Sequence, residues 1–446
     1  MEAFLNYFIH TYGCQMNVHD SEKIAGILQS IGYIECDSVD KADIVVFNTC
    51  CIRETAEKKI YGHIGQLKKL KIKNRNLIIV VCGCMSQQDG AVESIKKSYP
   101  YVDVVLGTAN LEMLKDAVLQ VSKRRKKFFN VDFLNTREED FSISRTSYPN
   151  AWVNIAYGCN NFCTYCIVPY VRGREHSRPI GDILKEVKSL LDEGYKEITL
   201  LGQNVNSYGH GLETGENFAM LLSEIGKLEE TYGKFRLRFM TSHPKDLSDE
   251  VIDVVSKYPV ICNNIHLPVQ SGSTEILRRM NRRYTREKYL ELISKIRAKM
   301  PDVGITTDIM VGFPGETEQD FEYTLDLVRQ AKYSSAFCFV YSRRKGTPAD
   351  KMEDQIPYKV KQSRITRLLA CQNEVTKEIS AQMVGNTYEV LVEGANFHYQ
   401  GVMCGRTESG RLVNFKCDSQ MIGQFVNVKI DKAKSATLWG SIVTEE

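Results

Sequence analysis

Short apolar runs alternate with amphipathic helical stretches over the first part of the chain. Alternation of strand and helix predicts a parallel sheet flanked by helices. We therefore expect an N-terminal α/β domain over residues 1–130. The expected strands are Phe4–His10, Ile44–Phe47, Leu77–Val81 and Val102–Leu106, and the expected helices lie near Asp20–Ile31, Arg53–Leu70 and Ala91–Lys97.

The same alternation resumes in the central part of the chain. Six strand–helix units predict a partial (β/α)6 barrel over residues 151–375, whose functional groups gather at the carboxyl ends of the strands. The charged and then polar segment Ser122–Asn150 is typical of a linker, which we place at residues 131–150. The expected barrel strands are Trp152–Ala156, Glu197–Leu201, Phe235–Met240, Asn264–Leu267, Gly304–Ile309 and Ala336–Tyr341.

After a helical stretch at Pro357–Val384, the pattern changes to short alternating strands separated by glycines. This pattern predicts a small β-barrel over residues 376–446, about the size of an OB-like module. No apolar run approaches the ~20 residues of a membrane span, and the N-terminus lacks signal-peptide or transit-peptide character. We therefore expect an α/β protein in the cytoplasm, with no membrane partner.

The charge of the chain is nearly balanced, with a formal net charge of +3. A nucleic-acid binder is usually more basic than that. Basic residues nevertheless gather in two blocks, Lys123–Lys127 and Arg278–Arg286. Such a block is either a solvated helix face or a phosphate site, and the charge pattern leaves both interpretations open.

Cysteine changes the picture most, since the chain has 14 of them and no export signal. In a long protein that resides in a reducing compartment, clustered thiols are more often metal ligands than partners in disulfide bonds. Cys159, Cys163 and Cys166 directly follow the first central strand. Three thiolates at this spacing hold three corners of an iron–sulfur cubane and leave the fourth iron open. Structural zinc normally takes four ligands, and no second pair or nearby histidine supplies the fourth.

A second set of cysteines lies in the first region. Cys14, Cys50 and Cys84 each follow an expected strand, so a parallel sheet would bring them to one carboxyl edge. A single cysteine near a strand is usually a packing residue, but three equivalent positions favour a second three-thiolate site. Cys51 adjoins Cys50, and Cys82 lies two residues before Cys84. Spacing alone does not decide which cysteine of each pair is the ligand.

These motifs resemble those of a known family. The Cys159–Cys166 pattern, with Tyr165 before its last cysteine, is similar to that of the radical S-adenosylmethionine (SAM) superfamily. Over essentially its whole length the chain resembles the methylthiotransferases of that superfamily, and its last region resembles a TRAM domain, an RNA-binding β-barrel. The other matching motifs are Tyr12-Gly-Cys-Gln-Met-Asn17, Asn48-Thr-Cys50, Gly83-Cys-Met85 and Arg172-Gly-Arg-Glu-His-Ser-Arg-Pro179.

The resemblance implies SAM and two 4Fe-4S clusters as cofactors. One cluster would be held by Cys159, Cys163 and Cys166, and the other by Cys14, Cys50 and Cys84, rather than by Cys51 or Cys82. No side chain alone is expected to be catalytic. Residues at the carboxyl ends of the barrel strands are expected to contact SAM: Tyr165, Gln203, Asn204, Ser242, His266, Gln270, Asp308 and Gly312, with His243 beside them.

Gln15 and Met16 are typical of the branch that acts on N6-dimethylallyladenosine in tRNA, whereas the threonylcarbamoyladenosine branch usually has Gly-Cys-Lys-type residues there. That resemblance implies addition of a methylthio group to carbon 2 of N6-dimethylallyl(isopentenyl)adenosine at tRNA position 37, next to the anticodon. The alternatives are threonylcarbamoyladenosine in tRNA, an aspartate of a ribosomal protein, or a non-enzymatic iron–sulfur RNA-binding sensor.

The implied partners are the tRNA anticodon stem-loop, an electron donor such as flavodoxin or ferredoxin, and the iron–sulfur assembly machinery. We expect the enzyme to act as a monomer. Phe415 and Arg411 are further candidates for RNA contact, with core packing the alternative for Phe415. The main candidates for RNA contact are Arg172, Arg174, Arg178, Arg406 and Phe397.

Overall fold

The computed structural model describes residues 5–51, 54–133 and 143–443. Phe4, Arg53 and the linker residues 134–142 lie outside these ranges. The chain forms two compact units: an N-terminal unit of residues 1–146, 158–160 and 167–174, and a C-terminal unit of residues 147–157, 161–166 and 175–446. The chain therefore passes between the units within the Cys159–Cys166 motif.

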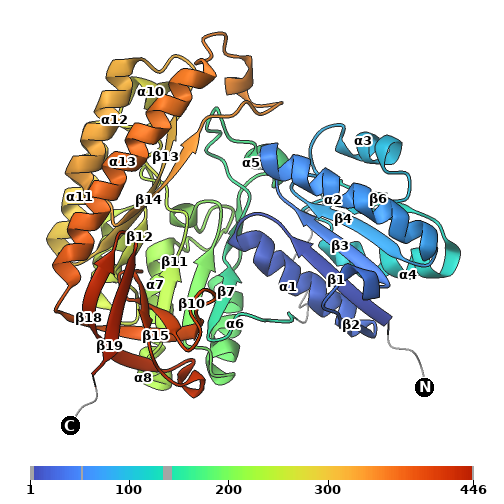
Figure 1. Cartoon of the computed structure of the whole chain (residues 1–446), viewed down its shortest axis with the longest axis horizontal. Coiled ribbons are helices and arrows are strands. Elements are labelled where there is room, and N and C mark those ends of the chain that lie inside the picture. Colours follow the sequence, from blue (N-terminus) through green and yellow to red (C-terminus); the bar gives the residue numbers. More distant parts are fainter. Residues whose placement is uncertain (1–4, 52–53, 134–142, 444–446) are drawn as a thin grey trace. The chain divides into compact units, whose positions relative to one another are not determined.

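The N-terminal unit is built on a six-stranded parallel sheet with the order β2-β1-β3-β4-β5-β6 (Figure 1). All residues of β3 and β4 are buried, so these strands appear in the sequence as continuous apolar runs. The four expected strands are confirmed. The strands are β1 (Leu5–Thr11), β2 (Tyr33–Glu35), β3 (Ile44–Thr49), β4 (Ile78–Gly83), β5 (Val104–Leu106) and β6 (Phe128–Asn130).

Helices cover both faces of this sheet. The helices α1 (Gln15–Ser30) and α4 (Leu114–Arg124) pack on one face, in a core that includes Ile24, Val46 and Val118. The helices α2 (Glu54–Lys73) and α3 (Ala91–Ser98) pack on the other, around Phe47 and Ile64. The sequence patterns missed β2, β6 and α4, and residues 122–130, assigned to a linker, complete α4 and form β6.

The central part of the C-terminal unit is an open barrel of parallel strands. Two three-stranded sheets, β7-β10-β11 and β12-β13-β14, are joined by a parallel bridge between Leu237 and Ile261. The six expected strands are confirmed. They are β7 (Asn150–Asn154), β10 (Glu197–Leu201), β11 (Arg236–Phe239), β12 (Asn264–His266), β13 (Gly304–Val311) and β14 (Ser335–Val340).

Amphipathic helices cover the outside of this barrel (Figure 1). Four of them, α9, α10, α11 and α12, begin at a Ser or Thr whose side chain accepts a backbone N–H of the first turn, which is a favourable N-cap. The main helices are α6 (Ile180–Asp192), α7 (Phe218–Gly226), α9 (Asp249–Lys257), α10 (Thr274–Arg279), α11 (Arg286–Lys299), α12 (Glu318–Ala331) and α13 (Tyr358–Met383). Short elements are α5 (Val168–Val171), α8 (Glu229–Tyr232), β8 (Ala156–Tyr157) and β9 (His176–Ser177). No helix in the described ranges is long and apolar enough to cross a membrane.

The last region forms the expected small β-barrel, closed in the order β15-β16-β17-β19-β18. Its core includes Val390, Val413 and Phe415, so Phe415 is a packing residue. Arg411 is buried and donates from Nη1 to the Ser334 carbonyl at 2.6 Å, so its role is structural too. The strands are β15 (Thr387–Ala395), β16 (Met403–Thr407), β17 (Leu412–Phe415), β18 (Phe425–Lys434) and β19 (Thr437–Ile442).

Candidate cluster and cofactor sites

Three cysteine-bearing turns meet at one edge of the N-terminal sheet. Cys14 follows β1, Cys50 follows β3 and Cys84 follows β4, and these three strands are neighbours in the sheet. A Cβ on Gly13 would lie 2.9 Å from the Cys50 Sγ, and φ at Gly13 is +117°. Glycine therefore allows the first turn to approach the second. We call the three cysteines the auxiliary site.

Hydrogen bonds tie the three turns together. Asn17 Nδ2 donates to the carbonyls of Tyr12 at 2.7 Å and Thr49 at 2.8 Å. Asn48 Nδ2 donates to the Asn17 carbonyl at 2.7 Å, and Cys84 N donates to the Thr49 carbonyl at 3.0 Å. The asparagines and threonine of the cysteine motifs thus fix the backbone that presents the thiols.

The backbone separates Cys84 from its neighbour Cys82. Cys82 lies within β4 and packs on the face covered by α1 and α4, whereas Cys84 packs on the face covered by α2 and α3. Gly83 between them has φ +91°, which reverses the alternation of side chains at the strand end. Cys82 therefore points away from Cys84. Cys51 stays close to the auxiliary site, since its thiol hydrogen-bonds to Cys84.

Arg172 also lies at the auxiliary site. Its side chain is only 7% exposed, and its Nε lies 3.4 Å from the Cys84 Sγ. Its Nη2 donates to Asn17 Oδ1 at 2.9 Å and to Asp20 Oδ2 at 3.0 Å. The guanidinium of Arg172 is therefore engaged within the auxiliary site, and its expected contact with RNA stays a prediction.

The surroundings of Cys84 favour its thiolate. The hydrogen bond from Cys51 and the positive charge of Arg172 outweigh burial and lower the pKa of Cys84 to about 6. Thiolates are the ligand form for iron, and soft sulfur donors suit an iron–sulfur cluster rather than a magnesium or calcium ion. The donor chemistry therefore fits a cluster.

No three His, Cys, Asp or Glu side chains of the described residues are arranged around a common metal position.

The radical motif, Cys159, Cys163 and Cys166, follows β7 and β8. Cys159 N donates to the Gly173 carbonyl at 3.2 Å within the N-terminal unit. In the C-terminal unit, Cys166 N donates to the Cys163 carbonyl at 2.9 Å. Arg282 Nη1 lies 3.4 Å from the Cys163 Sγ. Nothing in the sequence indicated this contact, since Arg282 appeared only as part of a basic block.

Residues after β12 hold the backbone of the same loop. Asn281 Nδ2 donates to the Phe162 carbonyl at 3.1 Å, and Thr164 N donates to the Met280 carbonyl at 3.1 Å. Tyr165 packs in an apolar cluster with Phe313 and nearby residues. The loop that carries Cys163 and Cys166 is thus held by the segment that follows α10.

The mouth of the central barrel contains buried polar atoms without a partner. They include Asn204 Oδ1, Asn206 Nδ2, Ser242 Oγ and His243 Nε2. Buried polar atoms are nearly always hydrogen-bonded, so this group fits a polar ligand at the carboxyl ends of β10 and β11. Burial and the charge of Arg282 lower the pKa of His243 to about 2, so its imidazole is neutral at pH 7. Asn206 was missing from the sequence-based candidates.

The remaining cofactor candidates lie at the following strands. His266 Nδ1 is 2.9 Å from Thr306 Oγ1, and its Nε2 is 3.7 Å from Asp308 Oδ2. Gln270 N donates to the Asp308 carbonyl at 2.8 Å. Gln203 directly follows β10 and Gly202. His266 and Asp308 lie within β12 and β13, while Gln203 and Gln270 follow β10 and β12. The contact of these candidates with SAM stays a prediction.

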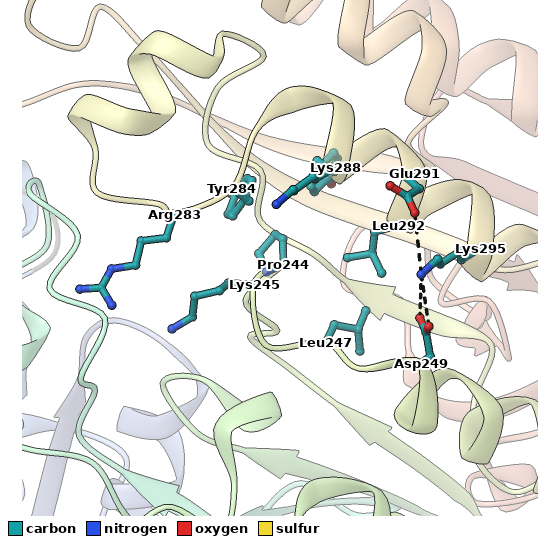
Figure 2. A pocket seen from close by; sticks show the side chains of 11 residues that line it. Pro244, Lys245, Leu247, Asp249, Arg283, Tyr284, Lys288, Glu291, Leu292 and Lys295 are labelled. Atoms are coloured by element: carbon teal, nitrogen blue, oxygen red, sulfur yellow. Dashed lines mark hydrogen bonds and ion pairs between the residues drawn. The ribbon is translucent and has the colours of Figure 1, made fainter.

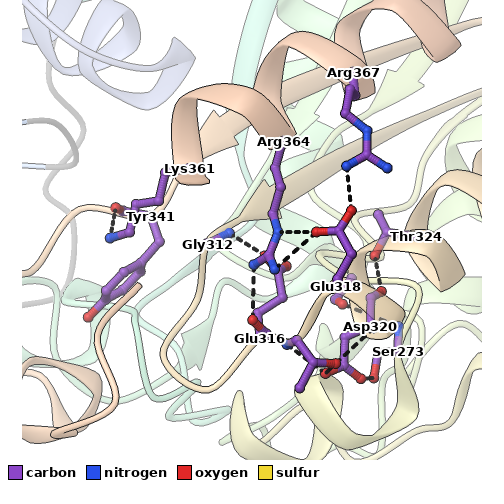
Figure 3. A network of polar contacts seen from close by, with 12 residues as sticks. Ser273, Gly312, Glu316, Glu318, Asp320, Thr324, Tyr341, Lys361, Arg364 and Arg367 are labelled. Atoms are coloured by element: carbon purple, nitrogen blue, oxygen red, sulfur yellow. Dashed lines mark hydrogen bonds and ion pairs between the residues drawn. The ribbon is translucent and has the colours of Figure 1, made fainter. Parts of the chain in front are cut away.

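A buried ion pair holds the turn after β13 (Figure 3). Gly312 N and Arg364 Nη1 both donate to Glu316 Oε2, at 2.7 and 2.8 Å. Burial outweighs these contacts and raises the pKa of Glu316 to about 7. Arg364 belongs to α13, so this helix fixes the turn that contains Gly312.

The remaining RNA candidates differ in exposure. Arg178 Nη1 donates to the Asn154 carbonyl at 2.6 Å and to Glu186 Oε2 at 2.7 Å, so it supports the barrel. Arg174 is exposed. Phe397 is fully exposed in the connection between β15 and β16, and the exposed Arg406 pairs with Glu393. Arg174, Phe397 and Arg406 remain candidates.

Solved structures share the architecture. The radical SAM methyltransferase TsrM from Kitasatospora setae aligns with a TM-score of 0.57, 14% identity and coverage of 78% of this chain and 77% of that one. The cobalamin-dependent SAM radical enzyme OxsB aligns with a TM-score of 0.56, 13% identity and coverage of 84% and 56%. At these identities the likeness concerns the fold alone.

Sequence families divide the chain into the same three regions. Residues 6–107 match the uncharacterized protein family UPF0004, residues 153–328 match the radical SAM superfamily, and residues 381–443 match the TRAM domain. The matched regions contain the auxiliary site, the radical motif and the C-terminal β-barrel respectively.

Curated relatives match nearly the whole chain. A tRNA-2-methylthio-N(6)-dimethylallyladenosine synthase from Clostridium botulinum (strain Langeland) is 53% identical over 435 residues, covering 97% of this chain and 96% of the relative. The protein of the same name from Acetivibrio thermocellus is 50% identical, covering 98% and 91%. The chain therefore belongs to the tRNA-2-methylthio-N(6)-dimethylallyladenosine synthase family of radical SAM proteins.

Proposed function

We propose that this chain adds a methylthio group to carbon 2 of N6-dimethylallyladenosine at tRNA position 37, next to the anticodon. The observation that carries the proposal is identity of 50–53% to synthases of this name over 97–98% of the chain. The three cysteine turns at one sheet edge and the polar barrel mouth support it, since the reaction needs both a sulfur-presenting site and a SAM site.

The chain's cysteines would hold both clusters. Cys159, Cys163 and Cys166 would bind the cluster that chelates SAM, and the auxiliary site would bind the second cluster. When bound, these clusters and SAM supply the electron, the radical and the sulfur for replacement of the C–H bond by C–S. Arg172 places a fixed positive charge beside Cys84, which offsets the negative charge of the thiolates.

The barrel mouth and the C-terminal β-barrel would hold the substrates. Asn204, Ser242 and neutral His243 offer buried polar atoms for SAM. A target adenine next to the anticodon must leave its stack to reach the barrel, as bases do in other base-modifying enzymes. Exposed Phe397 offers a stacking surface for an unpaired base of the anticodon loop.

The partners follow from this chemistry. Reduction of a cluster requires a low-potential donor, for which we propose flavodoxin or ferredoxin, and cluster loading requires the iron–sulfur assembly machinery. We propose a monomer that works in the cytoplasm, where its tRNA substrate is found. The names of the relatives favour dimethylallyladenosine over threonylcarbamoyladenosine or a protein aspartate, and the polar barrel mouth argues against a sensor without a cofactor.

The test is a reconstitution under anaerobic conditions. The cluster-loaded chain is incubated with SAM, a reductant and either dimethylallyladenosine-containing or threonylcarbamoyladenosine-containing anticodon stem-loop RNA. Nucleoside mass spectrometry should show the methylthio product only with the first RNA, together with 5′-deoxyadenosine. Product only with the second RNA, or only with a ribosomal protein, would refute the proposal.

A further inference from the structure

A basic pocket lies in the C-terminal unit (Figure 2). The loop after β11, with Pro244 and Lys245, forms one wall, and the segment from Arg283 into α11 forms the other. The cavity has a volume of about 350 Å³. That volume is in the range of pockets that take a molecular group rather than a single ion.

Positive charge in this pocket is only partly neutralised. Lys295 lies 3.2 Å from Asp249 and 3.9 Å from Glu291, so these three side chains largely neutralise one another. The side chains of Arg283 and Lys288 make no ion pair with any residue that the structure describes, and both residues are exposed. In Figure 2 they extend from the same wall into the open side of the pocket, away from the Lys295–Asp249 pair.

Lys245 adds a third cation from the opposite wall. Its Nζ is 3.2 Å from Asp246 Oδ1 and 3.0 Å from Asn161 Oδ1. Lys245, Arg282 and Arg283 all contribute to the low pKa of nearby His243, so their positive field reaches the barrel mouth. The lining carries four basic and two acidic side chains, so the pocket has a net positive charge, and Arg283 and Lys288 supply the part that no carboxylate of the described residues neutralises.

The pocket adjoins the residues that carry the proposed chemistry. Arg283 directly follows Arg282, whose guanidinium contacts Cys163. Lys245 contacts Asn161, which begins the segment that leads to Cys163. An anion held by Arg283 and Lys288 would thus lie next to the radical motif loop.

The lining favours a phosphate over a nucleobase. Tyr284 and Tyr289 line the pocket, but their side chains are buried and offer no free ring face for stacking. The exposed charged groups of the lining are one arginine, three lysines and two carboxylates, Asp249 and Glu291. Arginine and lysine are the residue types that contact phosphate oxygens in nucleic-acid complexes.

We propose that this pocket binds a phosphodiester of the tRNA strand that carries the target adenosine. The inference rests on the proposed function, since it takes tRNA as the substrate. A backbone phosphate held by Arg283 and Lys288 fixes the position of the strand without reading its sequence, and the adjacent nucleotide can then enter the barrel.

The test uses the full-length, cluster-loaded chain with the double substitution Arg283→Gln/Lys288→Gln. Binding of a labelled anticodon stem-loop RNA is measured by fluorescence anisotropy over a series of KCl concentrations. We expect affinity about tenfold weaker than for the wild type and a shallower salt dependence, with the slope of log K against log salt reduced by about one. The KM for tRNA should rise by a similar factor.

The matched control is Lys257→Gln/Lys299→Gln. These lysines lie on α9 and α11 outside the pocket lining, so the control removes the same number of positive charges from helices next to the pocket. It should bind RNA like the wild type. The proposal would be overturned if both double variants lost RNA affinity equally, or if the pocket variant bound RNA like the wild type. It would also be overturned if the pocket variant lost SAM binding but retained RNA binding.

The binding test is independent of the proposed reaction. Pocket-dependent RNA affinity without methylthio product would uphold the phosphate site and contradict the proposed function. Formation of methylthio product, with an RNA affinity that does not depend on the pocket, would uphold the proposed function and contradict the phosphate site.

Discussion

The Arg172 Nε lies 3.4 Å from the Cys84 Sγ, although the two residues are 88 positions apart in the chain. Arg172 follows the radical motif in sequence, yet its side chain lies in the auxiliary site. The same guanidinium pairs with Asp20, which lies on α1. One buried cation therefore balances a carboxylate and a thiolate at the edge where the three cysteine turns meet.

Substitution Arg172→Met should destabilise the auxiliary site. Removing one partner of a buried pair leaves Asp20 uncompensated, at a cost of about 3–5 kcal/mol. We expect roughly half the iron content of the wild type and a lower unfolding temperature of the N-terminal unit. Iron and sulfide counting with calorimetry would show this. Arg172→Lys keeps the charge, so its iron content and unfolding temperature should lie between those of the wild type and Arg172→Met. The control is Arg174→Met, at an exposed position.

Substitution Cys163→Ala should abolish cleavage of SAM, because two thiolates do not hold a cubane with an open iron. The auxiliary cluster should remain, since its ligands lie on other turns. Iron counting and a 5′-deoxyadenosine assay on the reduced protein would test this. Undiminished deoxyadenosine formation would contradict the assignment of the radical motif.

Substitution Cys50→Ala should stop methylthio product formation while 5′-deoxyadenosine is still formed. Cys82→Ala should behave like the wild type, because Cys82 lies on the opposite face of the sheet. Cys51→Ala should retain both clusters although its thiol contacts Cys84. Loss of the second cluster in Cys51→Ala, with retention in Cys50→Ala, would reverse the ligand assignment.

The Glu316–Arg364 pair should make stability depend on pH. Burial raises the pKa of Glu316 from 4.5 in the unfolded chain to about 7, so the folded state binds this proton more tightly. The stabilisation is complete below about pH 4.5 and is lost as the pH rises through about 7. The wild type should therefore lose stability relative to Glu316→Gln across this window. The free energy of unfolding of both proteins is measured by urea unfolding at each pH. If the curves of the wild type and Glu316→Gln run parallel, the pKa of Glu316 is not raised and the prediction is wrong.

Substitution Phe397→Ala should weaken RNA binding by about 1–3 kcal/mol, the usual worth of one base stacked on an aromatic side chain. Phe397 is fully exposed, so the change should leave the unfolding temperature unaltered. Anisotropy with stem-loop RNA measures the first effect and calorimetry the second. Tyr358→Ala, an exposed tyrosine at the start of α13, is the matched control, and equal affinities in both variants would assign Phe397 another role.

Point substitutions test the C-terminal barrel better than deletion. A truncation after Glu374 would remove the β-barrel, but the cut lies inside α13. It would also remove the carbonyls of Thr407 and Glu408, to which the buried Arg238 donates at 2.9 Å. The central barrel would then keep a buried guanidinium that has lost these partners, so the effect on RNA binding could not be separated from misfolding.

The sequence alone determined the strand–helix order, the β-barrel at the end and the two sets of cysteines. These features depend on local periodicity and on short spacings, which are visible along the chain. The strands β2 and β6 escaped because they are the two edge strands of the sheet, and only one of their six residues is buried, so neither appears as an apolar run.

Only the tertiary structure decided which side chains meet. It separated Cys82 from Cys84 through the left-handed Gly83, and it placed Arg172 beside Cys84 at the auxiliary site. It also placed Arg282 beside Cys163. The physical reason is that such contacts join residues 88 and 119 positions apart, and a buried charge is assigned its partner by packing rather than by sequence spacing.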